Sequence, residues 1–185
     1  MINQEKKPNI IIIFADDLGY GDLGCYGSKI NETPTLDKMA DEGKKFSNFY
    51  VSSPVCSPSR ASLLTGCYPQ RISFGTFDGL RVLFPGQGIG LSTEEKTIAK
   101  TLKESGYSTK IIGKWHCGDQ EDFLPTNHGF DSYFGIPYSN DMGRQVKIKD
   151  YIPNDSSLHK ITEWDRPPLP PVSYTHLTLP TSDLE

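Results

Sequence analysis

The sequence has 185 residues, a formal net charge of −4 and a pI near 5.6, and this acidic balance argues against a nucleic-acid-binding surface, which would be basic. The length indicates a single domain, and a hydrophobic content of 36% is enough for a packed core, so disorder throughout is excluded. The longest apolar run, residues 10–15, is far too short to span a bilayer, and the 4 cysteines are too few for a disulfide scaffold.

The chain opens with a polar segment, residues 1–8, that has neither the apolar stretch nor the cleavage site of a secretory signal. We therefore expect either a cytoplasmic protein or a true start upstream of Met1, in which case the complete protein would be periplasmic or secreted. This segment is expected to lie outside the folded domain.

Residues 9–14 form a continuous, mostly β-branched run that predicts a strand buried on both faces of a parallel sheet. Asp16 and Asp17 follow it, at the end where open α/β sheets bind ligands. After a glycine-rich loop, Thr33 and Pro34 are typical of a helix start. The predicted helix closes at Gly43 and has an apolar face formed by Leu36, Met39 and Ala40.

Four further elements follow in chain order. Residues 46–51 predict a second strand, and a turn then leads to Cys56 and a helix that ends at Gly66. A capping box of Ser92 with Glu95 predicts the start of another helix, which carries Ile98, Ala99 and Leu102 inward and stops at Gly106; a third strand is predicted over residues 107–112. This alternation of strands and helices indicates an α/β layered sheet.

From about Arg144 onward the periodicity decays, and several prolines between residues 167 and 171 exclude regular structure. Residues 172–185 resemble the translation of a transposase adapter used in sequencing-library preparation. We therefore assign residues 9–171 to the native domain and residues 172–185 to a non-native tail.

Cys56 and Arg60 form the most informative pair. Cys56 stands just before a predicted helix, where unpaired N–H groups and the helix dipole favour an anion. Arg60, one turn later, would project a guanidinium suited to a tetrahedral oxyanion such as sulfate or phosphate. A buried structural cysteine beside a surface arginine is the alternative interpretation of the pair alone.

Two other places carry polar side chains that could bind a metal ion or take part in catalysis. Asp16 and Asp17 are carboxylates behind a buried strand, and calcium is held by about 6–8 oxygen ligands, often carboxylates. Lys114 and His116 end the third predicted strand at i, i+2 spacing, so both side chains would point to the same side if the extended conformation persists. Each of these residues alone would be an ordinary surface residue.

The strings that surround these residues resemble the type I, formylglycine-dependent sulfatase family in its arylsulfatase A-like branch. They are CSPSRASLLTG at residues 56–66, IFADDLGYGD at 13–22, GKWH at 113–116, and HGFD with GIPYSND at 128–131 and 135–141. The resemblance runs from about residue 9 to residue 141, in the family's order. It implies an alkaline-phosphatase-like α/β/α sandwich with a mostly parallel central sheet, of which this chain holds the N-terminal part.

The resemblance implies that Cys56 is oxidised to formylglycine by a maturation enzyme. Asp16, Asp17 and residue 56 would bind a divalent cation, calcium or alternatively magnesium. Ser139 is expected to contact the sulfate group, and His128 to order a turn rather than take part in catalysis. The implied substrate is an organic sulfate ester, aryl or carbohydrate, cleaved to alcohol and sulfate.

The implied mechanism uses one hydroxyl of the hydrated formylglycine to attack sulfur. His116 then deprotonates the second hydroxyl, so that the aldehyde re-forms and sulfate leaves. Arg60, Lys114 and the cation hold the oxygens on which charge accumulates. The family's chains are more than twice as long and supply further ligands from their later half, so we expect the 185-residue chain itself to be inactive.

Three alternatives remain open. A phosphatase, phosphodiesterase or phosphonate hydrolase of the same superfamily is one, because some phosphonate hydrolases share the oxidised cysteine. A cysteine hydrolase that uses Cys56 with His116 is a second, and it predicts inactivation by thiol alkylation. The third is a truncated fragment with no function of its own.

Overall fold

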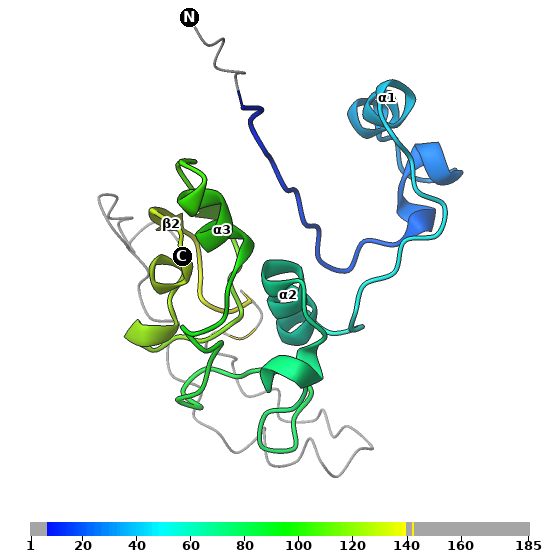
Figure 1. Ribbon diagram of the computed structural model, residues 1–185. Helices are drawn as coiled ribbons and strands as arrows, with labels where there is room; N and C mark the ends of the chain where they lie inside the picture. Colours follow the sequence, from blue (N-terminus) through cyan, green and yellow to red (C-terminus); the bar gives the residue numbers. More distant parts are fainter. Residues whose placement is uncertain (1–6, 140–141, 143–185) are drawn as a thin grey trace, which may run out of the picture. The chain divides into compact units, whose positions relative to one another are not determined.

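The computed structural model describes residues 7–139 and 142, which form two compact units that divide between Tyr50 and Val51 (Figure 1). The expectations for residues 1–6, for Asn140 and Asp141, and for the chain from Arg144 through the proposed 172–185 tail lie outside the described residues. Within the described part of the chain, no helix is long and apolar enough to cross a membrane.

The first unit is built around helix α1 (Pro34–Glu42), which follows the short 3-10 helices η1 (Tyr20–Asp22) and η2 (Gly24–Tyr26). Thr33 precedes α1 and Gly43 ends it, both as predicted. The Asp37 carboxylate accepts hydrogen bonds from the Cys25 N–H at 2.7 Å and the Thr33 hydroxyl at 2.9 Å. These bonds fasten the glycine-rich loop to the start of the helix.

Two predictions for this unit are wrong. Residues 9–14 do not form a strand, and Ile11 and Ile13 are 83% and 78% exposed. A strand needs a hydrogen-bonded neighbour, and the sheet among the described residues has two strands, both from the second unit. The predicted inward face of α1 is also exposed, at Leu36 and Met39.

The second unit holds the sheet and most of the helices. Strand β1 (Lys110–Ile112) pairs in parallel with strand β2 (Ser132–Phe134), an α/β arrangement as predicted. The remaining elements are α2 (Cys56–Thr65), η3 (Pro69–Ile72), α3 (Ile98–Glu104), η4 (Glu121–Phe123) and η5 (Pro125–His128). The predicted strand at 107–112 is confirmed over its last three residues. The strand predicted at 46–51, which spans the boundary between the two units, does not form, and Tyr50 is 83% exposed.

Helix α3 begins five residues later than the capping box predicts. Its N-cap is Thr97, whose hydroxyl accepts from the Lys100 N–H at 3.2 Å and donates to the buried His128 carbonyl at 2.6 Å. Ser92 and Glu95 instead form a turn closed by a 3.2 Å main-chain bond. The helix begins at Thr97 because the hydroxyl of this residue bonds both to a first-turn N–H of α3 and to the His128 carbonyl.

The main-chain pairing of β1 with β2 continues beyond both strands. The N–H groups of Gly113, Trp115 and His116 donate to the carbonyls of residues 134, 136 and 137 at 2.8, 3.0 and 2.7 Å. Gly135 lies against Gly113 so closely that a Cβ on it would come within 2.8 Å of the Gly113 nitrogen and still closer to its carbonyl. Only glycine permits this approach.

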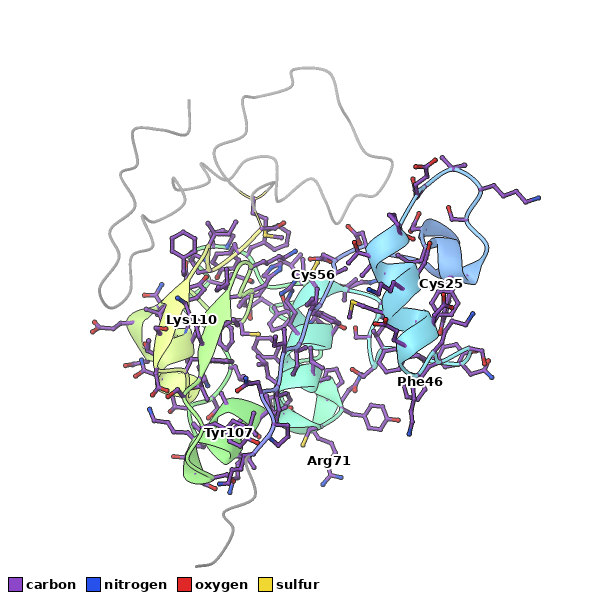
Figure 2. The ribbon with its side chains drawn as sticks, turned by 90° about the horizontal axis from the view of Figure 1, so that it is seen from above. Cys25, Phe46, Cys56, Arg71, Tyr107 and Lys110 are labelled. Carbon is purple, nitrogen blue, oxygen red and sulfur yellow. The ribbon has the colours of Figure 1, made fainter. Side chains whose placement is uncertain are left out.

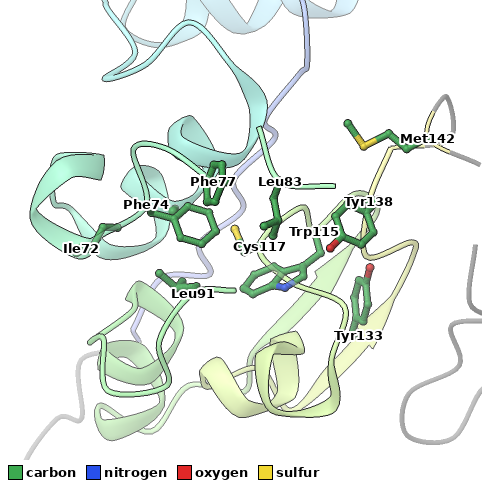
Figure 3. Packing of buried hydrophobic residues seen from close by; sticks show 11 residues of the cluster. Ile72, Phe74, Phe77, Leu83, Leu91, Trp115, Cys117, Tyr133, Tyr138 and Met142 are labelled. Atoms are coloured by element: carbon green, nitrogen blue, oxygen red, sulfur yellow. The ribbon is translucent and has the colours of Figure 1, made fainter. Parts of the chain in front are cut away.

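Above this pairing lies one buried apolar cluster, with Trp115 at its centre (Figure 3). The indole N–H of Trp115 donates to the Phe123 carbonyl at 2.9 Å, so its polar edge is satisfied inside the core. The other members are Ala61, Ile72, Phe74, Phe77, Leu83, Leu91, Cys117, Tyr133, Tyr138 and Met142. The residues on either side of His116 therefore belong to the core of this unit.

His128 is buried at the end of η5, with its ring 5.4 Å from that of Trp115. It ends a turn closed by Gly129, as predicted. Burial lowers the pKa of His128 to about 4; the nearby Lys100 cation adds to the shift and the Phe123 carbonyl opposes it.

Replacing Gly135 by alanine is expected to destabilise the second unit by about 1–3 kcal/mol, because the added methyl group overlaps the Gly113 main chain. Thermal unfolding of the protein would measure the loss. Gly21→Ala is the matched control, since a Cβ there meets nothing within 4 Å. Equal stability of the two variants would contradict the close approach.

Stability is expected to fall as the pH drops from about 6.5 to about 4. His128 has a folded pKa of about 4 against 6.5 for the free side chain, so the unfolded state binds a proton first. Its contribution to the loss at pH 4 would be about 3 kcal/mol. Denaturant unfolding across this range would show a flatter pH profile for His128→Gln, even if that variant is less stable at pH 7. Parallel profiles for the two proteins would refute the assignment.

Candidate active site

Cys56 is the first residue of α2, one position further into the helix than the sequence predicts (Figure 2). Val55 occupies the N-cap position and makes no side-chain capping bond, and Pro58 has no N–H. The Cys56 side chain is half-buried, whereas the next three residues are buried. An anion beside Cys56 would therefore meet first-turn N–H groups and the positive end of the helix dipole.

Arg60 lies one turn further along α2. Its Nη1 donates to the main-chain carbonyl of Lys114 at 2.7 Å. The bond joins residues that are 54 positions apart in the sequence. The structure thus brings together two of the predicted cationic residues, through a main-chain contact that the sequence did not predict.

The segment that carries Lys114 and His116 does not continue as an extended strand. β1 ends at Ile112, and the chain then adopts positive φ at Gly113 (105°) and at His116 (62°). Lys114 is half-buried, but His116 is fully buried. The extended conformation that would point Lys114 and His116 to the same side is therefore absent.

Three contacts define the position of His116. Its main-chain N–H donates to the Pro137 carbonyl, its ring packs edge-on against Tyr138 at 5.4 Å, and Nε2 lies 2.8 Å from the Leu83 carbonyl. A left-handed conformation at a non-glycine residue costs on the order of 1 kcal/mol or more, and persists only where neighbours hold it. These contacts hold His116.

Leu83 connects His116 to the cysteine-bearing helix. The Leu83 N–H donates to the buried Ser57 hydroxyl at 3.0 Å, on the residue that follows Cys56. The Tyr138 hydroxyl donates to the neighbouring Phe84 carbonyl at 3.0 Å. The helix that begins at Cys56 is therefore hydrogen-bonded into one assembly with the segment of Lys114 and His116, through Arg60 and through Ser57 with Leu83.

Cys117 is buried directly after His116. Burial raises the pKa of its thiol far above the ordinary value, and the Arg60 cation only partly opposes this shift. Burial likewise raises the pKa of Tyr138, with the Asp119 carboxylate adding to it. Both groups stay neutral near pH 7, so they act here as packing and hydrogen-bonding groups.

The remaining predicted residues are not placed in this assembly. Ser139 is half-buried two residues beyond Pro137, and its carbonyl accepts from the Met142 N–H. Asp16 and Asp17 are exposed in the first unit, with Asp17 at a φ of 58°. Among the described residues, no group of three or more His, Cys, Asp or Glu side chains could hold a metal ion.

Sequence reasoning missed Ser57 and Leu83. Ser57 lies inside the string that identified Cys56, but its residue type alone does not distinguish it from the other serines of α2. Leu83 acts through its main chain, for which no sequence signal exists. Tyr138 lies within the 135–141 string, where nothing marks it as the neighbour of His116.

Known proteins with similar sequences point to one family. The family model described as Sulfatase matches residues 8–178. The chain is 51% identical over 140 residues to arylsulfatase A of Homo sapiens, covering 75% of this chain and 27% of the relative. It is 46% identical over 151 residues to N-acetylgalactosamine-6-sulfatase of Rattus norvegicus, covering 80% of this chain and 29% of the relative.

Solved structures agree with the sequence matches. The crystal structure of Ps i-CgsB superposes with a TM-score of 0.69 at 40% identity, over 87% of this chain and 34% of that one. The PsFucS1 sulfatase from Pseudoalteromonas sp. gives 0.68 at 33% identity, over 88% and 33%. The fold is thus the predicted alkaline-phosphatase-like α/β type, and the chain spans roughly a quarter to a third of the length of these relatives. This chain belongs to the sulfatase family.

Proposed function

We propose that the full-length protein is a sulfuric ester hydrolase that cleaves an organic sulfate ester to an alcohol and sulfate. The observation that carries the proposal is the assembly at the start of α2. Arg60 donates to the Lys114 carbonyl at 2.7 Å, and Ser57, the neighbour of Cys56, is linked to His116 through Leu83. The names of the relatives support sulfate as the group removed.

Position 56 suits an oxidised cysteine. A thiol does not suit this reaction, which needs an oxygen nucleophile that can later expel sulfate. A formylglycine at position 56 would supply that oxygen in its hydrated form. The half-buried Cys56 side chain stands where first-turn N–H groups favour negative charge. Its neighbour Ser57 is buried and bonded to Leu83, which fixes the helix end around it.

We assign the other residues by their charge and contacts. Arg60 and Lys114 would bind the sulfate oxygens and stabilise the negative charge that develops on them. The bond from the Arg60 side chain to the Lys114 carbonyl keeps the two cationic residues close together. His116 would take the proton from the hydroxyl at residue 56, and we keep Ser139 as a proposed sulfate contact.

A divalent cation, calcium or alternatively magnesium, would supply further charge stabilisation at the sulfate oxygens. Asp16 and Asp17 have the carboxylate donors that hard cations prefer, and we propose them as ligands together with residue 56. They are too few for a complete shell, and no cluster of ligand side chains exists among the described residues. The roles assigned to Arg60, Lys114 and His116 are therefore derived without the cation.

We propose that the substrate is the sulfate ester of a carbohydrate or of an aryl alcohol. One relative is named a sulfatase of N-acetylgalactosamine, and one similar structure is of Ps i-CgsB in complex with a neocarrahexaose. Other relatives are named arylsulfatases, so the names support both ester classes.

Active full-length protein is expected to carry formylglycine at position 56 when produced with a maturation enzyme. Peptide mass spectrometry would identify it, and only unmodified thiol in active protein would contradict the proposal.

Paired assays on sulfate, phosphate and phosphonate esters of one alcohol are expected to show preference for the sulfate ester. Preference for the phosphonate ester would instead favour the phosphonate hydrolase. Cys56→Ala should abolish turnover, while Cys25→Ala and Cys67→Ala should not, and wild-type rates in Cys56→Ala would refute the mechanism.

Asp16→Asn or Asp17→Asn in the full-length protein should weaken calcium binding and activity together, since each change removes one anionic ligand. Isothermal titration with CaCl₂ would measure the affinity. Asp41→Asn is the matched control, because Asp41 is an equally exposed carboxylate in the same unit. Unchanged affinity in both variants would assign Asp16 and Asp17 to a structural role.

A further inference from the structure

We infer that Ser57 is a positioning residue that, through the main chain of Leu83, holds His116 with its ring proton on Nε2 and its lone pair on Nδ1. The inference rests on the proposed function and specifies which atom of His116 accepts the proton. It concerns a serine and a main-chain group to which the sequence assigned no role.

The ring proton follows from the hydrogen-bonding partner. Nε2 of His116 lies 2.8 Å from the Leu83 carbonyl oxygen, and the ring is fully buried. A carbonyl oxygen can only accept, so this contact is a hydrogen bond only when Nε2 carries the hydrogen. In the neutral ring the lone pair is then on Nδ1, and Nδ1 is the atom that takes up a proton.

The Leu83 peptide is itself held from its other side. Its N–H donates to the Ser57 Oγ at 3.0 Å, and both residues are fully buried. A buried N–H that loses its acceptor is unfavourable, and this favours movement of the peptide toward another partner. Removing the Ser57 hydroxyl would therefore displace the carbonyl that orients His116.

Ser57 lies in the first turn of α2, so the bond to its hydroxyl ties that turn to the Leu83 peptide. Its place beside Cys56 means that one short segment holds both the residue that is modified and the tether that orients His116. The left-handed backbone at His116, with a φ of 62°, turns the ring toward Leu83 rather than along the strand direction.

The test compares Ser57→Ala with two variants of the full-length protein. Ser57→Thr retains a hydroxyl at the same position. Ser62→Ala removes another buried hydroxyl from the same helix, one that makes no bond to Leu83. Long-range ¹H–¹⁵N NMR on ¹⁵N-histidine-labelled protein reports the tautomer of each ring, and His116→Asn identifies the His116 signals.

The wild-type protein should show His116 as the Nε2–H tautomer. Ser57→Ala should give a mixed or exchanging tautomer signal and a drop in kcat of about 10–100-fold, the usual range for residues that orient a functional group. Ser57→Thr should restore both, and Ser62→Ala should match the wild type.

Two results would overturn the inference. One is an Nδ1–H tautomer or a doubly protonated ring in the wild type at neutral pH, a measurement that needs no variant to fold. The other is Ser57→Ala with a tautomer signal and kcat equal to those of Ser62→Ala. If instead His116→Asn keeps full activity while the wild-type tautomer is as expected, the proposed role of His116 fails and the positioning by Ser57 stands.

Discussion

The parallel main-chain pairing between residues 110–116 and 132–137 is the constraint on which the second unit depends. It begins as β1 with β2 and continues for three more hydrogen bonds beyond β1, two of which go to residues beyond β2. Because Gly135 lets the two chains approach, the segment after β1 is fixed in place without being a strand. The core residue Trp115 and the functional candidates on either side of it are positioned by these bonds. Loss of the pairing would release all three residues at once.

Helix α2 meets this segment through two long-range contacts. One is the Arg60 bond to the Lys114 carbonyl, and the other is the path from Ser57 through Leu83 to His116. In both, side chains bind main-chain groups: the first tether depends on the Arg60 side chain, and the second depends on the side chains of Ser57 and His116. Main-chain groups are fixed by the fold, which makes such contacts accurate in position. The candidate site thus takes its geometry from the backbone more than from direct contacts between its functional side chains.

The sequence predicted the helix that begins at Cys56 because its signals are local: the chain turns before it, and Gly66 ends it in a left-handed conformation with a φ of 69°. The family and its candidate residues could also be predicted, since they rest on strings of neighbouring residues. Two features could not. His116 turns inward because of a positive φ and a distant carbonyl, and α3 begins at Thr97 because that hydroxyl also reaches His128. Residues 9–14 have the composition of a buried strand, but composition cannot supply the neighbour that a strand requires.

The burial of Cys117 has a consequence for chemical labelling. Reaction with an alkylating reagent requires both access to the sulfur and a thiolate, and Cys117 has neither, since it is fully buried and its pKa is raised. The other cysteines are partly accessible. A reagent applied to the folded protein would therefore leave Cys117 unlabelled until the core opens. The rate at which Cys117 is labelled would therefore report how fast the core opens beside His116.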